Sequence, residues 1–245
     1  MRALRKYIIF SSLTALIAVP SVTAQRNLND LMQQIRPLPN QEGPNGNPSA
    51  IKVARLHYSG GGDWYWGPSS LPNFLRFIHE NSDFPVDTNE YQVKVTDPEL
   101  FRYPFLFATG HGTMAFSPEE REQLRRYLNA GGFLFINDSY GMVPSVMKEL
   151  HQLFPEREVV DVPFDNPLYH CFYDFPNGPP KIHKHDGKPP RGYAVIINGR
   201  IVVYFLVESD IGDGWEDPQV HNDPQAKRLQ ALQMGLNLLT YALLH

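Results

Sequence analysis

The sequence contains a single cysteine, Cys171, and has no excess of positive charge. One cysteine cannot form an internal disulfide, so the fold of this 245-residue chain depends on a hydrophobic core. The formal net charge of −4 provides no positive field for a nucleic acid partner. Because 42% of the residues are hydrophobic and 20% are charged, the composition is that of a globular protein and not of a disordered chain.

Residues 1–24 have the three parts of a secretory signal peptide. Arg2, Arg5 and Lys6 form a basic start, residues 7–19 are apolar, and residues 22–24 read Val-Thr-Ala, with a small residue at the cleavage position. The sequence therefore predicts export to the periplasm or the cell exterior, with no stable transmembrane span after cleavage.

The rest of the chain divides into a linker and one domain. Residues 25–50 are rich in Asn, Pro, Gln and Gly and are expected to form a flexible linker. Residues 51–245 are long enough for one sizeable core. The sequence leaves the oligomeric state open.

From residue 51 onward, strand and helix patterns alternate. Strands are predicted at 51–58, 91–95, 103–109 and 133–136, and helices at 70–81, from Ser117 to 130, and from 142 to about 154. Ser117 and Glu120 have the spacing of a capping box. This order predicts an α/β fold with a doubly wound, mainly parallel sheet. Residues 192–206 then read as a β-hairpin around Asn198-Gly199, and residues 223–244 as a final helix.

The first polar cluster follows the first predicted strand and combines glycines with aromatics. It consists of Gly60, Gly61, Gly62, Asp63, Trp64 and Tyr65. Glycines after a strand allow a close backbone approach to a ligand, but the cluster lacks the lysine of a phosphate loop. Trp66 extends the aromatic run, and at least one of these three rings is expected to line a concave surface that binds a small polar ligand.

Two further clusters follow the next buried strands. His111 lies between glycines at the end of one strand, where it is expected to be exposed enough to act as a base or ligand. Asp138 and Ser139 lie where the next strand is predicted to turn sharply into a helix, in the manner of a nucleophile elbow. We expect His111 and Asp138 to approach within about 3–6 Å, with Trp64 beside them. The alternative is that Asp138 caps its helix and His111 faces solvent alone.

The second half of the chain offers weaker metal-ligand signals. In the proline-rich segment 155–191, His183 and His185 flank a lysine and precede Asp186, a set that is able to bind a divalent metal. An acidic loop with Asp210, Asp213, Trp215, Glu216 and Asp217 follows the hairpin without the spacing of an EF-hand. An exposed polar loop is the more common explanation of the histidine segment, and calcium is the minor alternative for the acidic loop. The sequence identifies no cofactor and leaves metal dependence open.

These features together resemble a bacterial family of exported proteins known as domain of unknown function four-one-five-nine. The resemblance covers residues 51 to 245 and rests on the glycine-aromatic loop 60–65, Leu71-Pro72-Asn73, the strand at 103–105 with Gly110-His111-Gly112, the segment 131–135 with Asp138, and the hairpin turn with Trp215. The family resembles the class I glutamine amidotransferase-like superfamily. The resemblance therefore implies a flavodoxin-like fold and no established activity.

The chain departs from an amidotransferase at the residues that such an enzyme needs. Asp138-Ser139 stands where the cysteine nucleophile belongs, and neither His183 nor His221 begins a His-x-Glu pair. Glutaminase activity is therefore not expected.

Three function classes remain. The leading interpretation is an exported domain that binds a small polar ligand, such as a carbohydrate or cell-envelope fragment, at the carboxyl edge of the sheet. A hydrolase is the alternative, with Ser139 or a metal-bound water as nucleophile and with His111 and Asp138 as its other catalytic groups. A scaffold in a membrane-associated complex is the third class, and it requires an exposed apolar patch.

Overall fold

A computed structural model describes residues 50–245 of the chain. The predicted signal peptide and all but the last residue of the predicted linker lie outside the described residues. No described helix combines the length and the apolar character that a membrane crossing requires.

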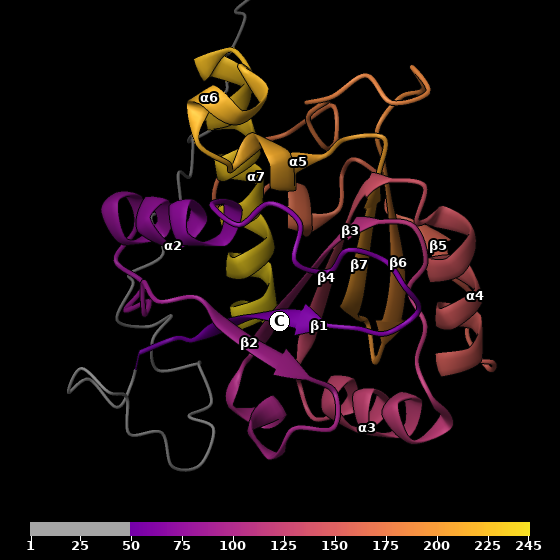
Figure 1. Cartoon of the computed structure of the whole chain (residues 1–245). Coiled ribbons are helices and arrows are strands. Elements are labelled where there is room, and N and C mark those ends of the chain that lie inside the picture. The colour runs from indigo at the N-terminus through magenta and orange to yellow at the C-terminus, as the bar shows by residue number, and fades with distance from the viewer. Residues whose placement is uncertain (1–49) are drawn as a thin grey trace, which may run out of the picture.

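The described chain forms one seven-stranded sheet in the order β2-β1-β3-β4-β7-β6-β5 (Figure 1). The strands are β1 (Val53–His57), β2 (Tyr91–Lys94), β3 (Phe105–His111), β4 (Phe133–Tyr140), β5 (Val160–Asp161), β6 (Arg191–Ile197) and β7 (Arg200–Val207). The first five in this order are parallel, and β6 and β5 add an antiparallel margin. When the parallel strands alone are numbered in chain order, β7 is the fifth, and their order in the sheet is 2-1-3-4-5. This is the order of flavodoxin-like sheets, with which the fold is consistent.

Helices connect the strands and close the chain. They are α2 (Ser70–Asn81), α3 (Pro118–Asn129), α4 (Val143–Leu153), α5 (Ile211–Gly214), α6 (Pro218–His221) and α7 (Gln225–Leu244), with short 3-10 turns at Pro98–Arg102 and Pro167–Tyr169. The capping box predicted at the start of α3 is present, because Ser117 accepts a hydrogen bond from the Glu120 amide while the Glu120 carboxylate accepts one from the Ser117 amide.

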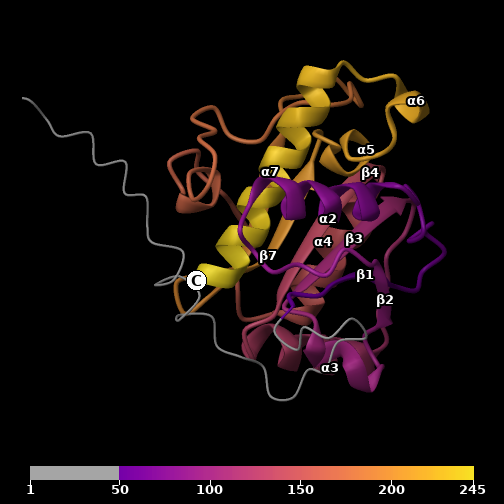
Figure 2. The ribbon, with the colours of Figure 1, turned by 90° about the vertical axis from the view of Figure 1, so that its left-hand side faces the viewer.

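Two hydrophobic clusters pack against the sheet, and strand alternation sorts the residues between them. On β3 and β4, Phe105, Phe107, Phe133 and Phe135 belong to the cluster with α2 and α7. Leu106, Ala108, Leu134 and Ile136 alternate with them and belong to the cluster with α3 and α4. Figure 2 shows α2 and α7 together on one side of the strands. Because β3 and β4 are buried on both faces, their sequences are continuous apolar runs.

The mainly parallel sheet, the late hairpin and the C-terminal helix are confirmed, and the prediction of helix 70–81 agrees with α2 residue for residue. The prediction of a sharp turn at Asp138-Ser139 is wrong. β4 continues through Tyr140, and the chain turns at Gly141, which has a φ of +82°. The strand extends because β3 also runs on to His111 and pairs with it.

Candidate functional site

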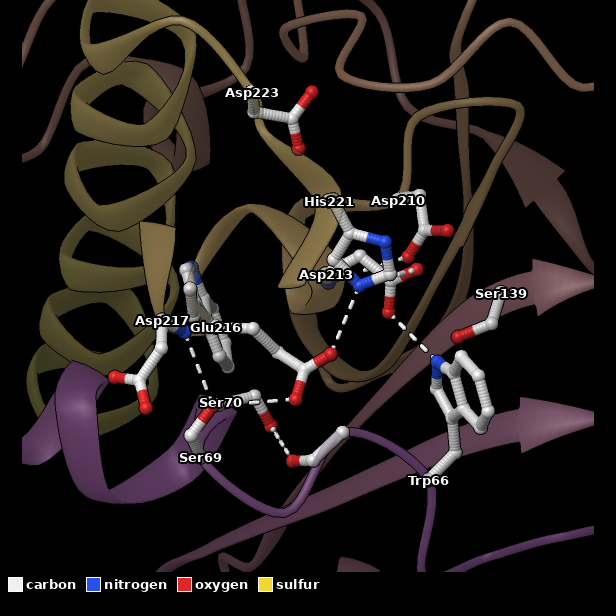
Figure 3. A network of polar contacts seen from close by, with 12 residues as sticks. Trp66, Ser69, Ser70, Ser139, Asp210, Asp213, Glu216, Asp217, His221 and Asp223 are labelled. Carbon is white, nitrogen blue, oxygen red and sulfur yellow. Dashed lines mark hydrogen bonds and ion pairs between the residues drawn. The ribbon is translucent and has the colours of Figure 1, made fainter. Parts of the chain in front are cut away.

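The chemistry-bearing side chains gather beyond the carboxyl ends of β3, β4 and β7. These three strands are parallel neighbours, so the segments that follow them meet at one edge of the sheet. Thr109, Asn137 and Ser139 face the α2 and α7 side by strand alternation, and they form one buried hydrogen-bonded set. The turn after β7 contacts this set, because Asn137 donates to Asp210 and accepts from the amide of Gly212 in α5. Figure 3 shows Asp210 and Ser139 at this edge.

His111 has a carboxylate partner, but it is Asp63 and not Asp138. The Asp63 carboxylate accepts a hydrogen bond from the His111 backbone amide, and its Oδ2 lies 3.1 Å from His111 Nδ1. The pairing arises because the loop after β1 folds back along residues 111–115, with the amide of Gly62 donating to the carbonyl of Thr113. This carboxylate leaves Nε2 as the outward nitrogen of a ring that is 38% exposed.

Asp138 and Ser139 occupy roles other than those predicted for a triad. Asp138 points to the α4 side of the sheet and accepts a hydrogen bond from the Met142 amide at 2.9 Å, which is the capping alternative. Burial raises its pKa. Ser139 is 3% exposed, and its hydroxyl pairs with Thr109 and Asn137. No imidazole is among its hydrogen-bond partners in the described chain, so the structure provides no base to activate it.

The glycine-aromatic loop is built by close backbone packing. Gly62 is required there, because a Cβ would lie 2.7 Å from the carbonyl oxygen of His111. The amides of Gly62 and Asp63 donate to residues 111–113 and are therefore not directed at a ligand. Trp64 does not wall the predicted cleft, because its ring stacks on His57 at 4.0 Å. Tyr65 is 63% exposed.

The strongest cluster at this edge is one in which three imidazoles surround two buried carboxylates. His183 Nδ1 lies 3.3 Å from Asp210 Oδ2 and 3.5 Å from Asp213 Oδ2. His185 Nε2 lies 3.2 Å from Asp210 Oδ2, and His221 Nε2 lies 3.4 Å from Asp213 Oδ2. These atoms form two overlapping sets that share His183, and each set is compact enough to hold a metal ion.

The spacing of these atoms is compatible with metal ligands. His185 Nε2 and Asp210 Oδ2 are within hydrogen-bond range at 3.2 Å, and the other three distances are longer than the usual N–H···O bond of about 2.7–3.2 Å. A tetrahedral zinc ion with bonds of about 2.0–2.1 Å sets neighbouring ligand atoms about 3.3–3.4 Å apart. The four distances of 3.2–3.5 Å are close to that separation.

The second nitrogen of His183 and the second oxygen of Asp210 are held from behind. His183 Nε2 pairs with Asp223 Oδ2 at 3.0 Å, which fixes the ring with Nδ1 toward the cluster. Asn137 Nδ2 donates to Asp210 Oδ1 at 2.9 Å, and Asn137 Oδ1 accepts from the amide of Gly212 at 3.1 Å. Such outer contacts orient the ligands of protein metal sites.

Two more contacts hold the Asp213 side of the cluster. The Trp66 indole donates to Asp213 Oδ1 at 2.8 Å, and His221 Nε2 also pairs with Glu216 Oε2 at 2.8 Å (Figure 3). The ring of Trp66 contacts His111 edge-on, with ring centroids 4.6 Å apart. One indole thus touches both the Asp63–His111 pair and the histidine-carboxylate cluster.

The electrostatics of the cluster require positive charge. Asp210 is 1% and Asp213 is 5% exposed, and the ion pairs of both in the described chain are with imidazoles, not with lysine or arginine. The hydrogen bond with Asp210 raises the pKa of His183. Burial, followed by the charge of Asp210, raises the pKa of Asp213. Without a metal ion, the cluster therefore retains protons between its carboxylates.

The sequence named most of this cluster without joining it. His183 and His185 were expected to act with Asp186, but the Asp186 carboxylate pairs with Tyr140 and Lys188 instead. Trp215, in the acidic loop, is a core residue that stacks on Phe74. His221 and Asp223 were not predicted as part of a metal site, because their place beside His183 and Asp213 arises from contacts between segments far apart in the sequence.

Fold and site together define an α/β domain with a histidine-carboxylate cluster at the carboxyl edge of its sheet. Over residues 52–243 the chain matches the family described as Domain of unknown function (DUF4159). The match spans most of the chain, so the protein belongs to this family. A comparison with curated proteins found no match.

Proposed function

We propose that this domain binds one divalent transition-metal ion, with zinc the best fit, and acts as a metal-dependent hydrolase. The observation that carries the proposal is the spacing of His183 Nδ1, His221 Nε2 and Asp213 Oδ2, with Asp210 and His185 beside them. Nitrogen and carboxylate ligands without thiolate are typical of catalytic zinc sites, in which a water fills the remaining position.

Burial supports a cation at this place. Two carboxylates out of water cost several kcal/mol each unless a positive charge compensates them. A divalent ion held by His183, His221 and Asp213, beside Asp210, would supply that charge and leave its imidazole ligands neutral, as ligation requires. The side chains of His183 and His221 are 24% and 19% exposed, so a bound ion is within reach of solvent and substrate.

The Asp63–His111 pair supports the hydrolytic part of the proposal. A bound zinc ion lowers the pKa of its water to about 7, which supplies a nucleophile at neutral pH. The Trp66 side chain contacts both His111 and Asp213, so it connects the two groups. Asp63 orients the imidazole ring of His111. In this role His111 moves a proton to or from the reacting group. Ser139 and Asp138 take no part in the mechanism.

Metal analysis of the full chain tests the metal site. After loading with zinc and removal of excess, we expect about one ion per chain, retained in the wild type and lost in His183→Ala. His151→Ala removes an exposed imidazole on α4 and serves as the matched control. A wild type that retains no more zinc than His183→Ala contradicts the proposal.

Chromogenic substrates test the hydrolase. We expect the zinc-loaded chain to hydrolyse at least one of p-nitrophenyl acetate, p-nitrophenyl phosphate and p-nitrophenyl N-acetylglucosaminide, and the chelator-treated chain none. His111→Ala should keep the zinc and lose at least about tenfold in rate, since general acid–base catalysis contributes roughly 10²–10⁴-fold. Stoichiometric zinc with no hydrolysis of any substrate leaves a metal-binding domain and refutes the enzyme.

We also propose that the chain is exported and that its fold belongs to the class I glutamine amidotransferase-like superfamily. The basic, apolar and small-residue segments of positions 1–24 support export. The 2-1-3-4-5 order of the parallel strands supports a doubly wound, flavodoxin-like domain. N-terminal sequencing of exported protein should give Gln25 as the first residue, and an intact Met1 refutes cleavage.

A further inference from the structure

We propose that a groove over β1 and β2, beside the start of α2, binds neutral saccharides independently of any metal ion. The groove has a volume of about 830 Å³, within the range of small-molecule sites. Its lining includes Arg55, Tyr65, Trp66, Glu90, Tyr91 and Gln92. Of the residues described at the candidate site, Trp66 also lines this groove, whereas the histidines and carboxylates of the cluster and of the Asp63–His111 pair do not, so the groove adjoins that site without sharing its charged groups.

The charged residues of the groove form a neutral, fixed pair. Arg55 is 1% exposed, and its Nε donates to Glu90 Oε1 at 2.6 Å. Its Nη1 donates to the carbonyl of Trp66 at 2.7 Å, and its Nη2 to the carbonyl of Gly67 at 3.1 Å. Arg55 thus ties Glu90 and the loop before α2 to strand β1, so the groove is shaped before a ligand arrives.

Glu90 is the member of this pair that offers a hydrogen-bonding group to a ligand. The Arg55 guanidinium is buried and donates to Glu90, Ser70 and the carbonyls of Trp66 and Gly67. Glu90 keeps acceptor capacity beyond its two contacts with Arg55, and its side chain is 15% exposed. A hydroxyl of a ligand can therefore donate to the Glu90 carboxylate, which Arg55 holds in place.

The charge of the pair disfavours anions. An anion, such as a phosphate or a uronate, meets the more exposed member of the pair, the carboxylate of Glu90, while the pair as a whole has no net charge to attract an ion of either sign. A neutral polyhydroxylated ligand avoids this repulsion and donates its hydroxyls to Glu90. The exposed amide of Gln92, which pairs in register with Arg55 across β1 and β2, adds a donor and one more acceptor.

Aromatic rings provide the apolar surface on which a sugar ring stacks. Tyr65 is 63% exposed although it is large and lies in a well-formed loop. Its ring meets Trp64 edge-on at 5.7 Å, and Trp64 is itself stacked on His57, so Tyr65 is supported from behind. An exposed, braced ring loses little conformational freedom on binding, which makes it an effective anchor.

Calorimetric titration of the full chain with cellohexaose, maltohexaose and chitohexaose tests the proposal. At least one of these neutral oligosaccharides should bind saturably, and chelator treatment should not change its Kd. Tyr65→Ala should weaken binding about tenfold, the loss of roughly one stacking contact, and Gln92→Ala should weaken it less. Both side chains are exposed, so both variants should fold as the wild type does. Phe164→Ala, which removes a ring that is 49% exposed elsewhere, is the matched control.

Several results would overturn the proposal. The first is that none of the three oligosaccharides binds at concentrations up to about 10 mM. Equal affinity of Tyr65→Ala and the wild type places the sugar elsewhere. Loss of binding after chelation assigns the sugar to the histidine-carboxylate cluster. Tighter binding of oligogalacturonate than of the neutral sugars refutes the charge argument. Because the chelator-treated chain is measured in parallel, failure of this site is distinguishable from failure of the metal site.

Discussion

Asn137 offers the sharpest test of whether the histidine-carboxylate cluster is a metal site. Its side chain is fully buried, donates to Asp210 and accepts from the amide of Gly212. Asn137→Ala leaves the buried amide of Gly212 without its acceptor and removes the nearer of two donors from Asp210 Oδ1, which keeps the amide of Asp213 at 3.4 Å. We therefore expect the free energy of unfolding to fall by about 2–4 kcal/mol. Because Asp210 loses the donor that orients it, zinc affinity should fall about 10–100-fold.

Asn237→Ala provides the matched control. Asn237 is also fully buried, and its side chain bridges the backbone of Tyr173 through a donated bond of 2.8 Å and an accepted bond of 2.7 Å. Its loss costs two buried hydrogen bonds of the same kind, away from the cluster. The two variants should therefore lose similar stability, while only Asn137→Ala loses zinc affinity.

Urea denaturation of the metal-free chains and competition with a chromophoric zinc chelator provide the two measurements. If Asn137→Ala binds zinc as the wild type does while its stability falls, Asn137 does not orient a ligand. If Asn237→Ala loses zinc affinity to the same extent, the effect comes from general loosening of the fold, and the positioning argument fails.

Three further outcomes test the packing around the site. Arg121→Ala removes the bidentate partner of Glu149, whose side chain is 5% exposed, and should lower the free energy of unfolding in urea by about 2–4 kcal/mol. Arg126→Ala, at an exposed ion pair, should change the free energy of unfolding by less than about 0.5 kcal/mol, and equal losses in the two variants refute this. Burial raises the pKa of Cys171 to about 12, so the thiol should resist a thiol-specific reagent at pH 8 until the chain is unfolded, and rapid labelling of the native chain contradicts this. Gly110→Ala should destabilise the chain by at least about 2 kcal/mol, because φ is +136° and a Cβ would lie 2.6 Å from a buried tyrosine hydroxyl; unchanged thermal unfolding refutes this.

The sequence predicts those parts of the fold that local patterns determine. Helix α2 follows from one apolar face, α3 from the capping box at Ser117, and the hairpin from Asn198-Gly199. The two-residue strand β5 and the short helices α5 and α6 were missed, because elements of two to four residues carry no periodic signal. In these segments, tertiary contacts determine the backbone conformation.

The candidate site is predictable only in part, because its pairings are non-local. His111 was expected to pair with Asp138, but Asp63 is its partner because the loop after β1 returns along residues 111–115. Asp138 does not reach His111, because strand alternation directs its side chain to the opposite face of the sheet. The sequence predicts that face only if the strand is known to continue past residue 136. β4 runs to Tyr140, so Asn137 and Ser139 share the face below Asp210 while Asp138 faces α4.

The buried carboxylates of the cluster are better explained by ligand binding than by a contribution to the stability of the fold. Replacing buried ion pairs by apolar residues is often neutral or stabilising, so a set of buried carboxylates is poorly explained as a stabilising device. Asp210 has a left-handed backbone with a φ of +64°, a further cost for a residue other than glycine. The fold bears both costs at the edge of a parallel sheet, where ligands bind in such folds, and it also supports the side chains through Asn137, Asp223 and Trp66. The proposed cation, held by carboxylates and imidazoles together, would account for the burial, the strain and the support at once.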